Sequence, residues 1–240
     1  MPDAALARKL AKFLHLGPLE LEALAQLEAN HRPVAAGTEL VRERDIEHNA
    51  YILEAGWACS YKLLPDGGRQ VIDFPIPGDV IGLRSLLLRT ADHSFAAVTD
   101  VTVAEVSAPQ LAETLERVPR LAAALLWGAS RDEAVVVKHL VNIGRRSALV
   151  WTAHFLVEMG LRLKLADSAS TDGYACPLSQ YMLADALGLT AIHVNRVLRQ
   201  LREQGLVTFR DGQVTFHDLA RLSKLADHHS GYLNQANGLH

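Results

Sequence analysis

Residues 178–201 constrain the fold of this chain more than any other segment, because their side chains specify two short helices and the turn between them. Ser179 suits the N-cap of the first helix, Thr190 suits the N-cap of the second, and Gly188 can adopt the left-handed backbone conformation of a tight turn. Apolar residues recur at helical spacing along the inner faces: Leu183, Ala184 and Leu187, then Val194, Val197, Leu198 and Leu201. This pattern predicts a helix-turn-helix.

The outer face of the second helix is polar and basic, with His193, Asn195, Arg196 and Arg199. Residues 190–210 hold four arginines and one glutamate, although the whole chain carries a formal charge of −3. Residues 206–209 and 213–216 flank Asp211-Gly212, which predicts a hairpin that serves as a wing. A chance helical hairpin could share the apolar pattern, but it would not need outward arginines. We therefore expect the second helix to enter the major groove of double-stranded DNA.

DNA contacts are expected from the start of the first helix and from the outer face of the second. The candidates are Ser179, Gln180, Thr190, Ala191, Ile192, His193, Asn195, Arg196 and Arg199. Arg196 follows Asn195 near the start of the second helix, where we expect it to read a guanine edge. Arg199 lies nearly one turn later, where a phosphate contact is expected.

The rest of the chain divides by its pattern of apolar and turn residues. Residues 1–30 predict two short helices separated by Gly17-Pro18. Residues 32–106 form short β-prone runs between turn residues, with the clearest hairpin around Asp66-Gly67-Gly68, and predict a barrel or sandwich. A short helix is expected over 108–117. The expected fold class is α+β, with residues 166–173 as a loop before the helix-turn-helix.

A longer helix is expected to start at Pro119 and to end or bend at Gly144. One apolar stripe follows alternating four- and three-residue steps along it, interrupted only at Glu133: Ala122, Leu126, Ala129, Val136, Leu140 and Ile143. The stripe is typical of a coiled-coil seam, so we expect it to join two copies of the chain. Packing of this helix on its own β-domain is the alternative.

Composition excludes several classes of protein. The chain has 49% hydrophobic and 21% charged residues, and it lacks a run of about 20 apolar residues that could span a membrane. The first residues do not resemble a secretory signal, so we expect a cytoplasmic protein. Neither Cys59 nor Cys176 is part of a CxxC motif or a Cys/His ligand cluster, so we expect neither a disulfide scaffold nor a zinc site. No nucleophile elbow, phosphate loop or metal-spaced His/Glu set indicates an enzyme.

Three features together resemble the Crp/Fnr family of bacterial transcription regulators across nearly the whole chain. Residues 37–45, 51–56 and 64–82 resemble the β-roll of its cyclic-nucleotide-binding domain. A long central helix follows, as in the dimers of the family, and residues 178–201 resemble its helix-turn-helix. The resemblance implies an effector domain over 1–118, a dimerisation helix over 119–146 and a winged helix-turn-helix domain over 147–240.

The resemblance also shows where the chain departs from members that bind cyclic AMP. Those members have Gly-Glu after the β-roll turn and Arg-Ser about ten residues later, whereas this chain has Gly82-Leu83 and His93-Ser94. Loss of the carboxylate and the guanidinium predicts that cyclic AMP is not bound. The remaining candidates for a ligand pocket are Gly82, Leu83, Arg84, Ser85, His93 and Ser94. Arg84 and Arg89 could supply substitute charge, or they could be solvated surface residues.

No cofactor is expected. The oxygen-sensing branch of the family holds an iron–sulfur cluster on N-terminal cysteines, and this chain has no cysteine before Cys59. The leading hypothesis is a homodimeric regulator that reads an inverted repeat and contacts RNA polymerase if it is an activator. The alternatives are a regulator that responds to thiol oxidation at Cys176 or to another small ligand in the β-roll, an enzyme that uses the β-roll cavity, and an interaction module with a vestigial helix-turn-helix.

Overall fold

The computed structural model describes residues 4–46, 48–228 and 231. The chain forms two compact units, and each contains segments that are distant in sequence. Among the described residues, the first unit includes those up to 62 together with 73–133, and the second includes 63–72 together with those from 134 to 231. The turn at Asp66-Gly67-Gly68, most of the strand Arg69–Asp73 and the C-terminal half of the longest helix therefore belong to the second unit. The domain boundaries expected at 118 and 146 stay a prediction.

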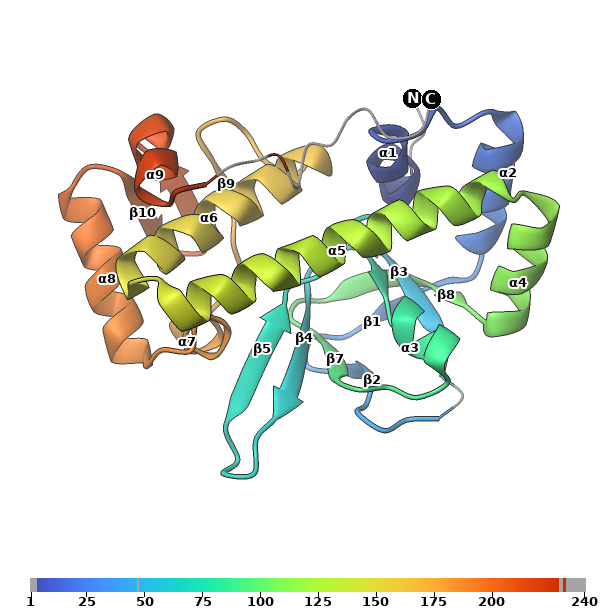
Figure 1. Ribbon diagram of the computed structural model, residues 1–240, viewed down its shortest axis with the longest axis horizontal. Coiled ribbons are helices and arrows are strands. Elements are labelled where there is room, and N and C mark those ends of the chain that lie inside the picture. Colours follow the sequence, from blue (N-terminus) through green and yellow to red (C-terminus); the bar gives the residue numbers. More distant parts are fainter. Residues whose placement is uncertain (1–3, 47, 229–230, 232–240) are drawn as a thin grey trace. The chain divides into compact units, whose positions relative to one another are not determined.

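Two antiparallel four-stranded sheets, apart from residues 63–72, form most of the first unit (Figure 1). One sheet has the order β1-β8-β3-β6 and contains His31–Val34, Val101–Val106, Ala50–Ala55 and Val80–Ile81. The other has the order β2-β7-β4-β5 and contains Glu39–Val41, Ser94–Ala97, Ala58–Leu63 and Arg69–Asp73. Fully buried Leu53 and Val103 belong to the apolar core of this β-domain. The predicted all-β region is confirmed in outline.

Helices pack beside these sheets through a second apolar cluster. It brings together α1 (Ala5–Ala11), α2 (Pro18–Leu27) and α4 (Ala108–Arg117) with residues of β3 and β8. Leu10, Leu24 and Ile52 are among its buried members. The helices expected in residues 1–30 and 108–117 are therefore present.

One part of the β-prone region is helical, contrary to the sequence prediction. Helix α3 covers Leu83–Leu88, directly after Gly82. Its Ser85 and Leu86 are buried, whereas Leu87 and Leu88 are 69% and 66% exposed. A run of apolar residues in which two face solvent carries no clear β or α period, and this explains the error.

The longest helix, α5, covers Arg120–Arg145, so it begins after Pro119 and ends one residue after Gly144. Helix α6 covers Ala148–Leu165, and its N-cap is Ser147, whose Oγ accepts a hydrogen bond from the backbone N–H of Val150 at 3.3 Å. Almost every residue of α6 from Trp151 to Leu163 is buried. Helix α6 therefore forms the centre of the second unit.

A buried hydrogen bond joins α5 to α6 within the second unit. His139 of α5 donates from Nε2 to Glu158 Oε1 at 2.8 Å, and His154 Nε2 lies 3.6 Å from the other carboxylate oxygen. Burial raises the pKa of Glu158, but His139, His154 and Arg162 outweigh this effect and hold the pKa well below its usual range. The Glu158 carboxylate is thus ionised, and the neighbouring His139, His154 and Arg162 side chains stabilise its negative charge inside the unit.

The remainder of the second unit is a small helical and β domain. It contains β9 (Gly173–Ala175), α7 (Gln180–Leu187), α8 (Ala191–Glu203), β10 (Val207–Arg210), β11 (Gln213–Phe216) and α9 (Leu219–Leu225). The strands form one antiparallel sheet in the order β10-β11-β9. No helix in the described residues is long and apolar enough to cross a membrane.

Candidate DNA-binding surface and ligand-binding segment

The first helix of the predicted motif, α7, has the cap and the buried face that its sequence indicates. Ser179 Oγ accepts a hydrogen bond from the backbone N–H of Met182 at 3.2 Å. Leu183, Ala184 and Leu187 are all buried. Gly188 ends the helix with φ of 65°, a left-handed conformation that would strain a residue with a side chain. The turn therefore depends on glycine.

The second helix, α8, separates an apolar face from a polar one. Thr190 Oγ1 accepts a hydrogen bond from the backbone N–H of His193 at 3.2 Å and caps the helix. The four residues predicted to face inward are buried: Val194, Val197, Leu198 and Leu201. Asn195, Arg196 and Arg199 are exposed, and His193 is half-buried. The predicted helix-turn-helix is confirmed in its helices, caps and turn.

The exposed face of α8 holds polar groups that the described protein atoms leave largely without partners. Arg196 forms no hydrogen bond or ion pair with any residue that the structure describes. Arg199 Nε lies 3.9 Å from Glu203 Oε1, an exposed i,i+4 contact of little energetic weight. Asn195 Nδ2 donates to Gln180 Oε1 at 3.2 Å, which connects the start of α7 to α8. These groups can therefore accept a new partner at little cost.

The predicted wing is present as β10 and β11. Val207 pairs with Phe216 and Arg210 pairs with Gln213, so Asp211-Gly212 forms the two-residue turn. Both turn residues have positive φ, as this type of hairpin requires. Arg210 is exposed near the turn, with Nε 3.3 Å from Asp211 Oδ2. The short strand β9, which pairs with β11, is absent from the sequence prediction because three residues carry too little pattern.

Sequence reasoning missed a contact between β5 and α7 inside the second unit. Arg69 donates from Nε and Nη2 to Asp185 Oδ2 at 3.0 and 2.8 Å. Gln70 Nε2 donates to the backbone carbonyl of Ala186 at 3.4 Å. Each pair is separated by 116 positions, so no local pattern could have revealed it. The start of β5 thereby contacts α7, the helix that precedes α8.

The environment of Cys176 argues against an oxidation switch. Cys176 is only 1% exposed, and burial raises the pKa of its thiol to about 12. Thiol oxidation proceeds through the thiolate, which is scarce at neutral pH for such a group. The structure therefore disfavours the thiol-redox alternative.

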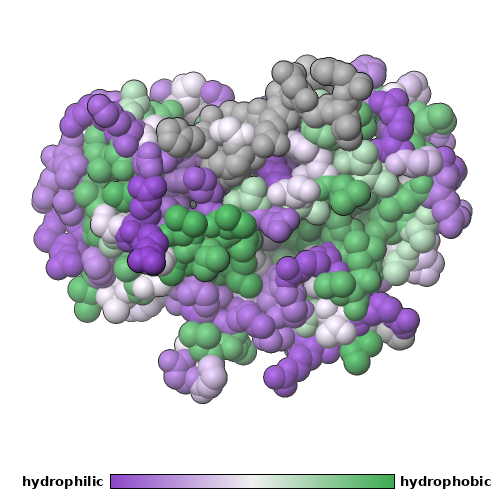
Figure 2. Space-filling model, viewed as in Figure 1, coloured by the Kyte–Doolittle hydropathy of each residue, from purple (hydrophilic) through white to green (hydrophobic). Residues whose placement is uncertain are grey.

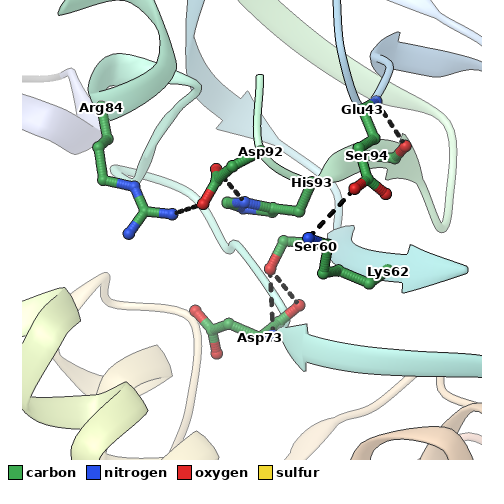
Figure 3. Close-up of polar contacts among 8 residues, drawn as sticks. All are labelled: Glu43, Ser60, Lys62, Asp73, Arg84, Asp92, His93 and Ser94. Carbon is green, nitrogen blue, oxygen red and sulfur yellow. Dashed lines mark hydrogen bonds and ion pairs between the residues drawn. The ribbon is translucent and has the colours of Figure 1, made fainter. Parts of the chain in front are cut away.

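Among the candidate ligand residues of the β-domain, Arg84 and His93 both interact with Asp92 (Figure 3). Arg84 donates from Nη2 to Asp92 Oδ2, and His93 Nδ1 lies 2.7 Å from Asp92 Oδ1. Burial raises the pKa of Asp92, but hydrogen bonds from Arg84 and His93 outweigh it and lower the pKa overall. Burial also lowers the pKa of His93, although Asp92 opposes this effect. His93 is thus neutral at pH 7, and the Arg84 guanidinium is already paired with the Asp92 carboxylate.

The serines of this segment have different surroundings. Ser94 Oγ accepts a hydrogen bond from the backbone N–H of Glu43 at 2.9 Å, while the Glu43 carboxylate pairs with Lys62 at 3.1 Å. Ser85 is 1% exposed, and its Oγ has no hydrogen-bond partner among the described atoms. Leu83, at the start of α3, cannot accept a hydrogen bond from a ligand hydroxyl. The segment therefore offers one unpartnered hydroxyl and no unpaired charge at Arg84, Asp92 or His93.

The residues predicted to form the seam of α5 remain accessible. Leu126, Val136, Leu140 and Ile143 are 66%, 42%, 72% and 44% exposed. Ala129 is exposed and Ala122 is half-buried. Figure 2 shows a hydrophobic patch over the C-terminal half of α5, which also contains exposed Val137 and Val141. The opposite residues Leu121, Ala124 and Val135 are buried, so the stripe is not the face that α5 turns toward its own chain.

A winged helix-turn-helix with an exposed basic face that follows a β-domain and a long helix is the arrangement of a class of DNA-binding regulators. Comparison with known proteins agrees with this class. Residues 31–118 match the cyclic nucleotide-binding domain, and residues 152–225 match the Crp-like helix-turn-helix domain. The chain belongs to the Crp/Fnr family of DNA-binding transcription regulators.

Named relatives cover most of the chain. The nitrogen fixation regulation protein FixK of Bradyrhizobium diazoefficiens is 33% identical over 222 residues, which cover 92% of this chain and 86% of the relative. The transcriptional activatory protein AadR of Rhodopseudomonas palustris is 31% identical, with coverage of 91% and 90%. The structure of FixK2 from Bradyrhizobium japonicum has a TM-score of 0.74 at 31% identity, with coverage of 81% and 96%.

Proposed function

We propose that this chain acts as a homodimer that reads an inverted-repeat operator in double-stranded DNA through α8. The proposal rests on the two faces of α8. One face is apolar and buried, and on the exposed face Arg196 has no partner among the described residues. An uncompensated guanidinium beside Asn195 suits a base edge, where arginine can donate two hydrogen bonds to guanine.

The candidate contact residues have distinct proposed roles. Ser179 and Gln180 start α7, where hydroxyl, amide and backbone N–H groups are suited to phosphate. Thr190, Ala191, Ile192 and His193 form the first turn of α8, and Asn195 and Arg196 follow on its exposed face. Arg199, one turn further along, is proposed to contact phosphate. The wing is proposed to lie along the sugar–phosphate backbone.

The exposed stripe of α5 supports the homodimer. Burial of leucine and valine side chains stabilises an interface, and a charge placed among them would lose its solvation without gaining a partner. Val136→Glu and Leu140→Glu are therefore expected to convert the dimer to a monomer in sedimentation velocity. Leu19→Glu is the matched control, because Leu19 is 68% exposed on α2, outside the stripe. An unchanged dimer in both α5 variants would exclude this seam.

The β-domain is proposed to act without cyclic AMP as effector. Leu83 replaces an acceptor for ribose hydroxyls, neutral His93 replaces a phosphate-binding guanidinium, and Arg84 is occupied by Asp92. Another small ligand, or contacts with another protein, would then set its state. The proposed location is the cytoplasm, where RNA polymerase is the further partner if the protein is an activator.

Selection from random double-stranded DNA with the full-length chain tests the central proposal. A dimer should enrich an inverted repeat whose half-sites are about 34 Å apart, or one helical turn. Gel-shift measurements on genomic fragments would then identify bound promoters. Failure to enrich any inverted repeat would contradict the proposed function.

A further inference from the structure

The first turn of α8 carries an apolar side chain that the fold of this unit does not use. Ile192 is 85% exposed, a larger fraction than any other large hydrophobic residue in the described ranges. It directly follows Ala191, the first residue of the helix. A β-branched residue has a lower helix propensity than alanine, so neither packing nor local structure explains its presence here.

The neighbours of Ile192 place it in the proposed recognition surface. Asn195 and Arg196 lie three and four positions later, so all three side chains emerge on one side of α8. Asn195 is held by Gln180 of α7, which fixes the amide beside the isoleucine. Tyr181, on the first turn of α7, is 76% exposed. The start of α8 thus presents one apolar group among polar ones.

We propose that Ile192 selects thymine at one position of each operator half-site by contact with its 5-methyl group. This inference rests on the proposed function. The side chain of isoleucine has no donor or acceptor, so it cannot recognise the polar edges of guanine, cytosine or adenine. The thymine methyl is the apolar group that an unmodified base presents in the major groove. Contact between the two removes apolar surface of both from water.

Deoxyuridine provides the sharpest test, because it differs from thymidine only by the missing methyl group. The selected operator is synthesised with each thymine replaced in turn, symmetrically in both half-sites. Kd is measured by fluorescence anisotropy with the full-length protein at one fixed salt concentration. At one position, removal of the methyl is expected to weaken binding by about threefold to tenfold per half-site.

The variant Ile192→Ala is measured on the same set of DNA duplexes. It is expected to bind the unmodified operator more weakly and to be insensitive to deoxyuridine at the position that affects the parent protein. Arg199→Ala is the control, since it should lower affinity while retaining the sensitivity to the methyl group. Circular dichroism should show an unchanged fold for Ile192→Ala, because the replaced side chain lies outside the core.

The outcomes separate this inference from the proposed function. Equal sensitivity of the parent and Ile192→Ala at every thymine would overturn the role of Ile192 and leave operator binding intact. Insensitivity of both proteins to every methyl group would overturn it in the same way. Failure to enrich any operator would contradict the proposed function and this inference together.

Discussion

The outer face of α8 and the segment from Gly82 to Ser94 are the two regions where the sequence predicts ligand contacts, yet their charged side chains are arranged differently. On α8, Arg196 has no partner among the described residues. In the β-domain, Arg84 pairs with Asp92, which also interacts with His93. A free guanidinium gains a partner when an anion binds, whereas a paired one must first give up the partner that it has.

Residue type alone therefore does not identify a binding site for an anion. Both regions contain arginine and histidine, and both resemble ligand-contacting segments of one family. Of these two regions, only α8 has an arginine, Arg196, that no described residue pairs with. A phosphate in the β-domain would have to compete with Asp92 for Arg84, and burial lowers the pKa of His93, which leaves that side chain without a positive charge at neutral pH.

The largest effect is expected for Arg196→Ala. An arginine that donates two hydrogen bonds to guanine contributes about 1–3 kcal/mol of discrimination, so the variant should lose about fivefold to 150-fold in operator affinity per half-site and much less on scrambled DNA. Arg196→Lys is the matched control, because it retains charge but lacks the planar fork and should not restore specificity. Binding curves on both DNAs measure the effect. Equal losses on operator and scrambled DNA would contradict base reading by Arg196.

A smaller effect, of another kind, is expected for Arg199→Ala. A phosphate contact acts on every sequence, so affinity should fall similarly on operator and scrambled DNA. The slope of log K against log salt should decrease by about one unit for each protomer of the dimer, because one phosphate contact is lost in each half-site. Arg42→Ala controls for net charge, since Arg42 is an exposed arginine of the first unit. A selective loss on the operator would instead assign base contact to Arg199.

Arg69 of β5 is also paired, and its partner Asp185 belongs to α7 of the helix-turn-helix. The two side chains are 31% and 30% exposed, so we expect a coupling of about 0.5–1 kcal/mol. A double-mutant cycle of Arg69→Ala and Asp185→Ala in urea denaturation measures it. Additive losses would show that the pair does not stabilise the second unit.

Much of this arrangement could be predicted from sequence because its determinants are local. Ser179, Gly188 and Thr190 specify the motif through caps and a turn, each within a few residues of the groups that they bond. The long-range features could not be predicted in this way. Arg69 and Asp185 are separated by 116 positions, and the short apolar run of α3 has no clear helical period.

The pairing of the candidate ligand residues could not be predicted from local sequence either. The sequence places Leu83 and His93 where members of the family that bind cyclic AMP have a glutamate and an arginine. It could not show that Asp92 neutralises Arg84, since that depends on how the loop after α3 places the carboxylate. Nor could it show that burial lowers the pKa of His93. Pairing and burial are properties of the folded chain.

The smallest effect is expected when cyclic AMP is added. Titration calorimetry of the full-length protein should show no saturable heat at micromolar concentrations, and operator affinity should not change. Asp92→Ala makes the test sharper, because it releases Arg84 from its carboxylate. The pair is exposed, with side chains 63% and 51% accessible, so its loss should alter stability by less than about 1 kcal/mol.

The freed arginine should still be insufficient to bind cyclic AMP. Leu83 provides no acceptor for the ribose hydroxyls, and a buried polar group of the ligand without a partner costs about 1–3 kcal/mol. Asp92→Asn serves as the control that keeps the shape of the side chain while removing its charge. Saturable binding by the parent protein would contradict the account of the β-domain. Binding by Asp92→Ala alone would show that the paired carboxylate, rather than the missing anchors, excludes the nucleotide.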